Sequence, residues 1–154
     1  MRLRINFGAL KKIKNKIKGE FGDHADASDL VDDIVRAAGQ RCLSKTIKRT
    51  PVDTGQLRKN WEMHEPVKRG FNHTVDIENP VEYATCVEFG HRIRHRQTVG
   101  RYVPQIGKRL VRPYVEGKYI KPVYMAMKSV EEIKEELPDI AEERMIKKFL
   151  EIFP

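Results

Sequence analysis

Cysteine is scarce in this chain, and long apolar runs are missing. Cys42 and Cys86 are the only cysteines, and they form no C-x-x-C pair, so nothing indicates a disulfide framework. No stretch approaches the roughly 20 apolar residues that a membrane-spanning helix needs, and none has the pattern of a signal peptide. These absences predict an intracellular protein with reduced thiols and no membrane partner.

Acidic residues are almost missing from residues 91–121, although they are frequent elsewhere. Glu116 alone stands there against nine basic residues, so this segment has an excess equal to the +8 net charge of the whole chain. Such an excess is typical of a surface that meets phosphates or acidic protein. The basic residues are Arg92, Arg94, Arg96, Arg101, Lys108, Arg109, Arg112, Lys118 and Lys121.

Apolar residues alternate with the basic ones over 91–121, and glycines and prolines punctuate the segment. This alternation predicts an extended β-hairpin arm. A solvated loop, a partner-binding arm and direct contact with DNA are the three interpretations of it, and no known DNA-reading module is present. We expect the arm to be mobile in the free subunit and ordered on assembly, because its like charges repel.

The chain of 154 residues fits one domain, which includes the basic arm. A domain of this length buries about two thirds of its unfolded surface. All charged residues among the first eighteen are basic, and apolar residues recur at helical spacing, which predicts an amphipathic basic helix. Docking on an acidic neighbour, a membrane surface or nucleic acid would each suit such a helix. Its apolar residues are Leu3, Phe7, Leu10, Ile13 and Ile17.

A second helix is predicted from Ser28, whose hydroxyl can cap it, to the corner at Thr50-Pro51, where proline forbids its continuation. Its expected buried residues are Leu30, Val31, Ile34, Val35, Ala37, Ala38 and Cys42. In the corner, the side-chain oxygens of Asp53 and Thr54 can accept amide hydrogen bonds, and Gly55 can take a positive φ. A new helical turn then buries Leu57 and Trp61.

Asp53-Thr54-Gly55 is also the tripeptide of aspartic proteases, and residues 105–108 loosely resemble a second retroviral-type element. Those enzymes need two aspartates that share a proton, each after an apolar strand. Asp53 instead follows Thr-Pro after a helical pattern, so a structural turn is preferred and a protease is the remote alternative. We predict no catalytic residues and no cofactor.

After the corner the apolar period changes. Two antiparallel strands are predicted over 61–67 and 74–78, joined by a loop over 68–72, and Asn79-Pro80 ends the second strand. Residues 81–90 predict a short helix with Tyr83 and Val87 on one side and Gly90 as a left-handed stop. Residues 119–127 fit either a buried strand or the lead-in to a helix.

The C-terminal segment predicts a helix that begins at the capping box Ser129 to Glu132 and that Pro138 kinks or restarts. Its later apolar stripe suits the core or an oligomer seam, of which the core is preferred. The stripe consists of Ala141, Met145, Ile146, Phe149, Leu150, Ile152 and Phe153.

Cys86, His91 and His95 have a spacing that suggests zinc, but no fourth ligand is nearby, so we predict no metal site. Asp53 and Glu88 are candidates for capping, or for ion pairs with Arg58 or Arg92.

Two motifs and their spacing resemble the small neck proteins of long-tailed bacteriophages and prophages, the head–tail joining or tail-completion family. The resemblance covers Leu30 to Arg92 and rests on Pro51-Val52-Asp53-Thr54-Gly55 with Leu57-Arg58, then Val81, Tyr83-Ala84 and Val87-Glu88-Phe89-Gly90. It implies an α+β fold with a long helix on a small sheet and no catalysis. It also implies assembly in the host cytoplasm and a place in the virion neck or tail, with copies of itself, other neck or tail proteins and packaged DNA as partners.

Overall fold

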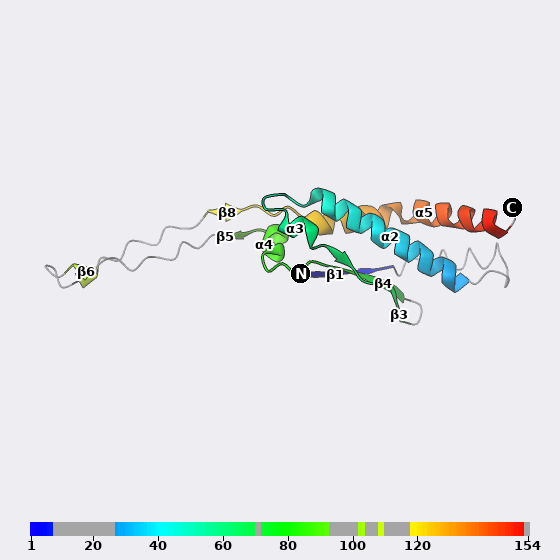
Figure 1. Cartoon of the computed structure of the whole chain (residues 1–154), viewed down its shortest axis with the longest axis horizontal. Helices are drawn as coiled ribbons and strands as arrows, with labels where there is room; N and C mark the ends of the chain where they lie inside the picture. The colour runs from blue at the N-terminus through cyan, green and yellow to red at the C-terminus, as the bar shows by residue number, and fades with distance from the viewer. Residues whose placement is uncertain (8–26, 70–71, 93–101, 104–107, 110–117, 153–154) are drawn as a thin grey trace.

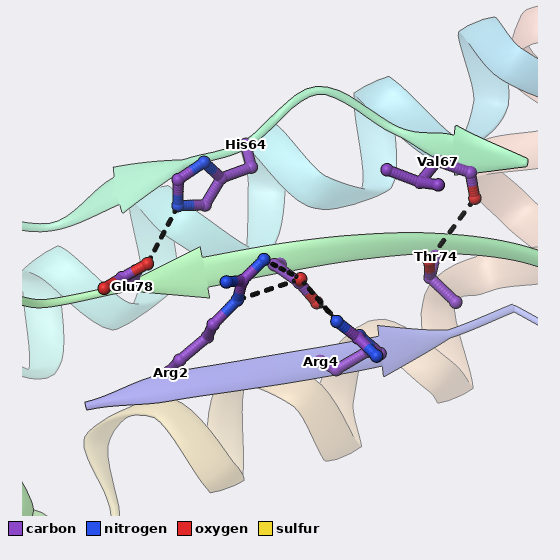
Figure 2. Close-up of polar contacts among 7 residues, drawn as sticks. Arg2, Arg4, His64, Val67, Thr74 and Glu78 are labelled. Atoms are coloured by element: carbon purple, nitrogen blue, oxygen red, sulfur yellow. Dashed lines mark hydrogen bonds and ion pairs between the residues drawn. The ribbon is translucent and has the colours of Figure 1, made fainter.

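The structure is a computed structural model that describes residues 1–7, 27–69, 72–92, 102–103, 108–109 and 118–152. Two long helices, α2 (Ala27–Arg49) and α5 (Met125–Ile152), pack along each other (Figure 1). Both lie behind a small antiparallel sheet, whose other face is open in Figure 2. The predicted α+β class, with long helices packed on a small antiparallel sheet, is therefore confirmed.

The sheet has β4 (Asn72–Glu78) at its centre. β1 (Arg2–Asn6) pairs along one edge of β4, and β2 (Glu62–Met63) and β3 (Val67–Arg69) pair along the other. Arg4 lies opposite Asp76, and Val67 lies opposite Thr74. The first of the two strands predicted after the corner is divided into β2 and β3, and the second is β4. The β3–β4 pairing extends into the loop expected at 68–72, of which residues 70–71 lie outside the described part.

The predicted N-terminal helix is wrong for Arg2–Asn6, which form strand β1. Leu3, Ile5 and Phe7 also alternate with polar residues, and this period of two matches an edge strand whose inner side chains reach the core. Pairing with β4 is a tertiary contact that the helical spacing could not show. The rest of the predicted helix, from residue 8 to 18, lies outside the described residues.

Helix α2 follows its prediction closely. All seven residues expected on its buried face are in the core, and the helix ends at Arg49, just before the corner. Arg58 donates from Nε to the carbonyl of Ile47 at 3.0 Å and from Nη2 to that of Lys48 at 3.3 Å. These bonds satisfy two of the carbonyls that a helix leaves open at its C-terminal end.

Helix α5 begins at Met125, four residues before the predicted capping box, which is therefore wrong. Ser129 is buried inside the first turns, where its hydroxyl donates to the carbonyl of Met125 at 2.7 Å and accepts from Arg49. Glu132 pairs with Lys45 and Arg49 of α2 instead of capping its own helix. Both capping-box residues thus contact the basic side chains of α2, Ser129 through a hydrogen bond and Glu132 through ion pairs, and the local pattern cannot show these long-range contacts.

The apolar stripe of α5 belongs to the core only in its first half. Ala141 is buried, but Ile146 is 55% exposed and Leu150 is 62% exposed, so placing the whole stripe in the core was wrong. Pro138 lies inside the continuous helix, so the helix does not restart at this proline. The far end of α5 therefore leaves an apolar surface on the isolated subunit. Phe153 lies outside the described residues.

The predicted hairpin arm is visible in two places. Its base is the pair β5 (His91–Arg92) and β8 (Tyr119–Ile120), and farther out β6 (Tyr102–Val103) pairs with β7 (Lys108–Arg109). Figure 1 places β6 at the end of the molecule opposite to the C-terminus. Residues 119–127 thus combine a short exposed strand with the start of α5. Arg94, Arg96, Arg101 and Arg112, and the predicted mobility, fall outside the described residues.

The open face of the sheet is organised around Asp76, whose side chain is only 8% exposed and forms ion pairs with two arginines, Arg2 and Arg4. Arg4 Nε donates to Asp76 Oδ1 at 2.9 Å, and Arg2 Nη2 donates to Oδ2 at 2.5 Å. The hydrogen bond from Arg4, followed by that from Arg2, lowers the pKa of Asp76 from 3.8 to about 2 against the opposing effect of burial. Asp76 thus fixes both guanidinium groups.

We expect Asp76→Asn to lower the free energy of unfolding by about 1–2 kcal/mol at neutral pH, a value reduced for the solvent around the exposed arginines. Because the folded-state pKa is lowered, this contribution is present above the unfolded pKa and is lost as the pH falls through about 2. Urea unfolding at several pH values should show a shallower loss between about pH 4 and 2 in the variant than in the wild type. Parallel acid profiles would contradict this assignment.

Candidate functional site

The corner at residues 50–55 connects α2 to the short helix α3 (Gln56–Lys59). Two side-chain hydrogen bonds hold its first residue, Thr50, in place. The Thr50 hydroxyl donates to the carbonyl of Thr46 at 2.7 Å and accepts from Trp61 Nε1 at 2.9 Å. Trp61 is 5% exposed, so its predicted burial is confirmed, and its indole N–H has the partner that a buried tryptophan requires. Thr50 consequently ties the start of the corner to the buried Trp61.

Gly55 adopts φ +78° immediately before α3, as the sequence predicted. Thr54 Oγ1 accepts from the amide of Gln56 at 3.4 Å, and Asp53 is exposed. An exposed aspartate in a turn after a helix differs from the paired aspartates of a protease. The second protease-like element, at residues 105–107, lies outside the described residues, while Lys108 belongs to β7.

We expect Gly55→Val to destabilise the fold by about 1–3 kcal/mol, because a β-branched residue resists a positive φ. A Cβ added here would meet nothing closer than Lys59 Cε at 3.9 Å, so the cost comes from the backbone. Gly55→Asn is the matched control, since asparagine tolerates this conformation and should cost much less. Thermal unfolding measures both, and equal stability of wild type and Gly55→Val would refute the strain.

The second motif forms helix α4 (Ala84–Phe89), which is fastened to the start of α5. Glu88 is fully buried, and its carboxylate accepts from the amides of Ala126 at 3.1 Å and Met127 at 2.8 Å. The carbonyl of Val87 also accepts from the amide of Val123 at 3.1 Å. Glu88 is thus the N-terminal cap of α5, supplied from another element.

Gly90 ends α4, but not as the predicted left-handed stop. Its φ of 74° is positive, yet its ψ of 165° is extended, so the chain leaves the helix directly into strand β5. A Cβ on Gly90 would lie 2.6 Å from the carbonyl oxygen of Ile120 and 2.8 Å from Tyr119 Oη. The missing side chain is what allows β8 to approach at the base of the arm.

Asn79 is the site residue that sequence reasoning missed, because it was interpreted only as the end of a strand. It is buried between the two motifs, where Nδ2 donates to the carbonyl of Leu57 at 2.8 Å and Oδ1 accepts from the amide of Val81 at 3.1 Å. Its backbone carbonyl also accepts from the N-terminal amine of Met1 at 2.6 Å. The only available signal was an asparagine between the motifs.

The two motifs meet across a surface hollow of about 260 Å³. Val52, which is 57% exposed, and Tyr83, which is 43% exposed, contribute apolar surface to it, and Phe89 is exposed on α4. The hollow offers shape and apolar contact. It is lined by Pro51, Val52, Asp53, Thr54, Gly55, Leu57, Tyr83 and Val87.

Metal-binding chemistry finds no support in the described part of the chain, where no three His, Cys, Asp or Glu side chains converge. His91 Nδ1 lies 3.4 Å from the backbone carbonyl oxygen of Cys86, and His95 lies outside the described residues. Cys42 is buried, which raises the pKa of its thiol to about 11.

None of the helices that the structure describes combines the length and apolarity needed to cross a bilayer.

The predicted partner-binding residues that the structure describes lie along the arm. Arg92 is exposed in β5 at its base, and Lys108 and Arg109 form β7. The arm begins directly after α4, so the apolar hollow and the basic arm adjoin along the chain.

Comparison with known proteins agrees with these motifs. No curated protein and no solved structure matches the chain significantly. Residues 9–90, more than half of the chain and including both motifs, match the family described as "Bacteriophage HK97-gp10, putative tail-component". The chain therefore belongs to the HK97-gp10-like family of bacteriophage tail components.

Proposed function

We propose that this protein is a non-enzymatic structural component of the phage neck, which joins head and tail by self-association and by docking to neighbouring neck or tail proteins. It assembles in the host cytoplasm and stays in the virion. The hollow between the two motifs carries this proposal. Its lining is held in place by Asn79 and Glu88, yet it presents Val52 and Tyr83 to solvent.

This arrangement favours docking because the buried polar side chains near the hollow are already committed to the fold. The buried Glu88 carboxylate binds two backbone amides, and Asn79 binds Leu57 and Val81. A rigid hollow with exposed aromatic and aliphatic rims suits an apolar anchor from a partner protein, since such anchors provide most of the energy of protein contacts. We infer that the hollow receives a neighbour's side chain.

The basic arm supplies the second contact of this function. Its described pieces are two separate strand pairs, β5 with β8 and β6 with β7, and Arg92, Lys108 and Arg109 belong to their strands. Acidic protein in the neck or packaged DNA would each neutralise its charge. Purified protein should show DNA binding that weakens steeply with salt only if phosphates are its partner. Salt-insensitive or absent DNA binding would assign the arm to protein.

Complementation of a phage that lacks this gene tests the proposal. We expect the wild-type protein to restore infectious particles, whereas Tyr83→Asp and Val52→Asp should leave separate full heads and tails in electron micrographs. Both changes place a charge on an exposed rim, so the variants should fold. Thr85→Asp is the matched control, because Thr85 is exposed on the same helix but does not line the hollow.

Normal joining by the two rim variants would exclude the hollow as the docking surface. Normal virions in the complete absence of the protein would exclude the function itself. These two outcomes are separate, since the first concerns the site and the second concerns the role of the chain.

A further inference from the structure

The open face of the sheet presents fixed arginines to solvent. Arg2, Arg4 and Arg69 surround a hollow of about 260 Å³, together with Asn6, Asn72, Thr74 and Asp76; we call this surface the arginine face. Arg2 and Arg4 use only Nε and Nη2 to bind Asp76. Within the described structure neither Nη1 has a partner, so each guanidinium retains donors that point away from Asp76.

Fixed arginines of this kind suit an acidic partner. Asp76 holds Arg2 and Arg4 in one orientation, so little side-chain entropy is lost when a carboxylate binds. Three arginines against one aspartate leave an excess of positive charge in the hollow, and Glu78, on the same face of the sheet, is 3.0 Å from His64 Nε2. By the strand register, Arg2 lies opposite Glu78 and Arg69 lies opposite Asn72, so the arginines extend over about 20 Å along β4.

The same chain carries a matching acidic surface on α5. Four exposed acidic residues recur there every three or four positions, and none forms an ion pair or side-chain hydrogen bond with another described residue. Their row is about 16 Å long at 1.5 Å rise per residue, close to the length of the arginine face. This acidic stripe consists of Glu131, Glu135, Asp139 and Glu142.

The two surfaces lie on different sides of the subunit. Figure 2 shows Arg2 and Arg4 in front of the sheet and the helices behind it. The acidic stripe is exposed, whereas Ile133, Leu137 and Ile140 on the other side of α5 are buried. A subunit therefore cannot bring its own stripe onto its own arginine face, but a neighbouring copy can.

We propose that the arginine face of one subunit binds the acidic stripe of α5 on the next copy. This inference rests on the proposed function, in which the protein associates with itself, and names the surfaces that meet. A contact between two different surfaces is heterologous, so each subunit offers one surface in each direction. Repetition of such a contact closes into a ring when the rotation between neighbours allows it.

Charge reversal tests this contact in solution. The first variant is Arg69→Glu, at a residue that does not bind Asp76, and the second combines Glu135→Arg with Asp139→Arg. Each variant should show self-association weakened about tenfold or more in sedimentation experiments at low salt. An equal mixture of these two proteins should associate more strongly than either protein alone, because the intact stripe of the first variant meets the intact arginine face of the second. Lys147→Glu, exposed on α5 beyond the end of the stripe and on another side of the helix, is the control.

Combining Arg69→Glu with Asp139→Arg in one chain should restore part of the lost association, since the signs are exchanged. Unchanged association of all variants, or a wild-type protein that stays monomeric at every attainable concentration, would overturn the proposal. Loss of DNA binding instead of self-association in Arg69→Glu would also overturn it and assign the face to phosphates. If these results arise while the wild type still restores joining of heads and tails, the proposed function stands without this contact.

Discussion

Replacing Glu88 by alanine should lower the free energy of unfolding by about 2–4 kcal/mol, one of the two largest effects that we expect. The carboxylate is fully buried and accepts from the amides of Ala126 and Met127 at the start of α5. Alanine removes both bonds, leaves two amides without a partner and takes a negative charge from the positive end of a long helix. Urea unfolding of the purified protein measures the loss.

Glu88→Gln separates the effect of charge from that of shape. Glutamine keeps one carbonyl oxygen as an acceptor but loses the second acceptor and the charge, so its stability should lie between those of the wild type and alanine. Glu82→Ala, a change at an exposed residue just before α4, should have almost no effect on stability. A stability of Glu88→Ala within about 0.5 kcal/mol of the wild type would show that Glu88 does not cap α5.

Replacing Gly90 by alanine should cost about 2–4 kcal/mol, because strain from a positive φ is combined with a steric clash. The new Cβ would lie 2.6 Å from the carbonyl oxygen of Ile120 and 3.0 Å from the amide nitrogen of Pro122, both of which are backbone atoms. The chain around β5 and β8 would have to separate, so we also expect faster trypsin cleavage after Arg92 and Lys118.

Gly55→Ala is the matched control for this variant. Its φ of +78° is close to the +74° of Gly90, but a Cβ at Gly55 finds nothing nearer than 3.9 Å. The difference in stability between the two alanine variants therefore measures the close contact at the base of the arm without the backbone strain. Equal losses in the two variants would show that the arm does not depend on this approach.

Local signals made the helices around the corner predictable. The buried face of α2 followed from apolar periodicity, and its end followed from Pro51, because proline acts on its nearest neighbours. The positive φ of Gly55 and the burial of Trp61 were also readable from short spacings. Each of these features depends on residues that are close along the chain.

Long-range pairing explains the errors. Residues 2–6 fit a helix and a strand equally well in isolation, and only the partner β4, some seventy positions later, selects the strand. The start of α5 depends on Glu88, which lies 38 positions before Ala126, so a local capping box at Ser129 was misleading. Asn79 joins the two motifs through side-chain hydrogen bonds that no sequence pattern predicts.

In vitro complementation tests most directly the claim that this chain joins phage heads to tails. An extract from cells infected by a phage without this gene is mixed with the purified protein, and infectious particles are counted. We expect separate heads and tails to join, and infectivity to rise with added wild-type protein but not with Tyr83→Asp. An extract that is fully infectious before the protein is added, or one in which heads and tails stay separate after it, would contradict the account.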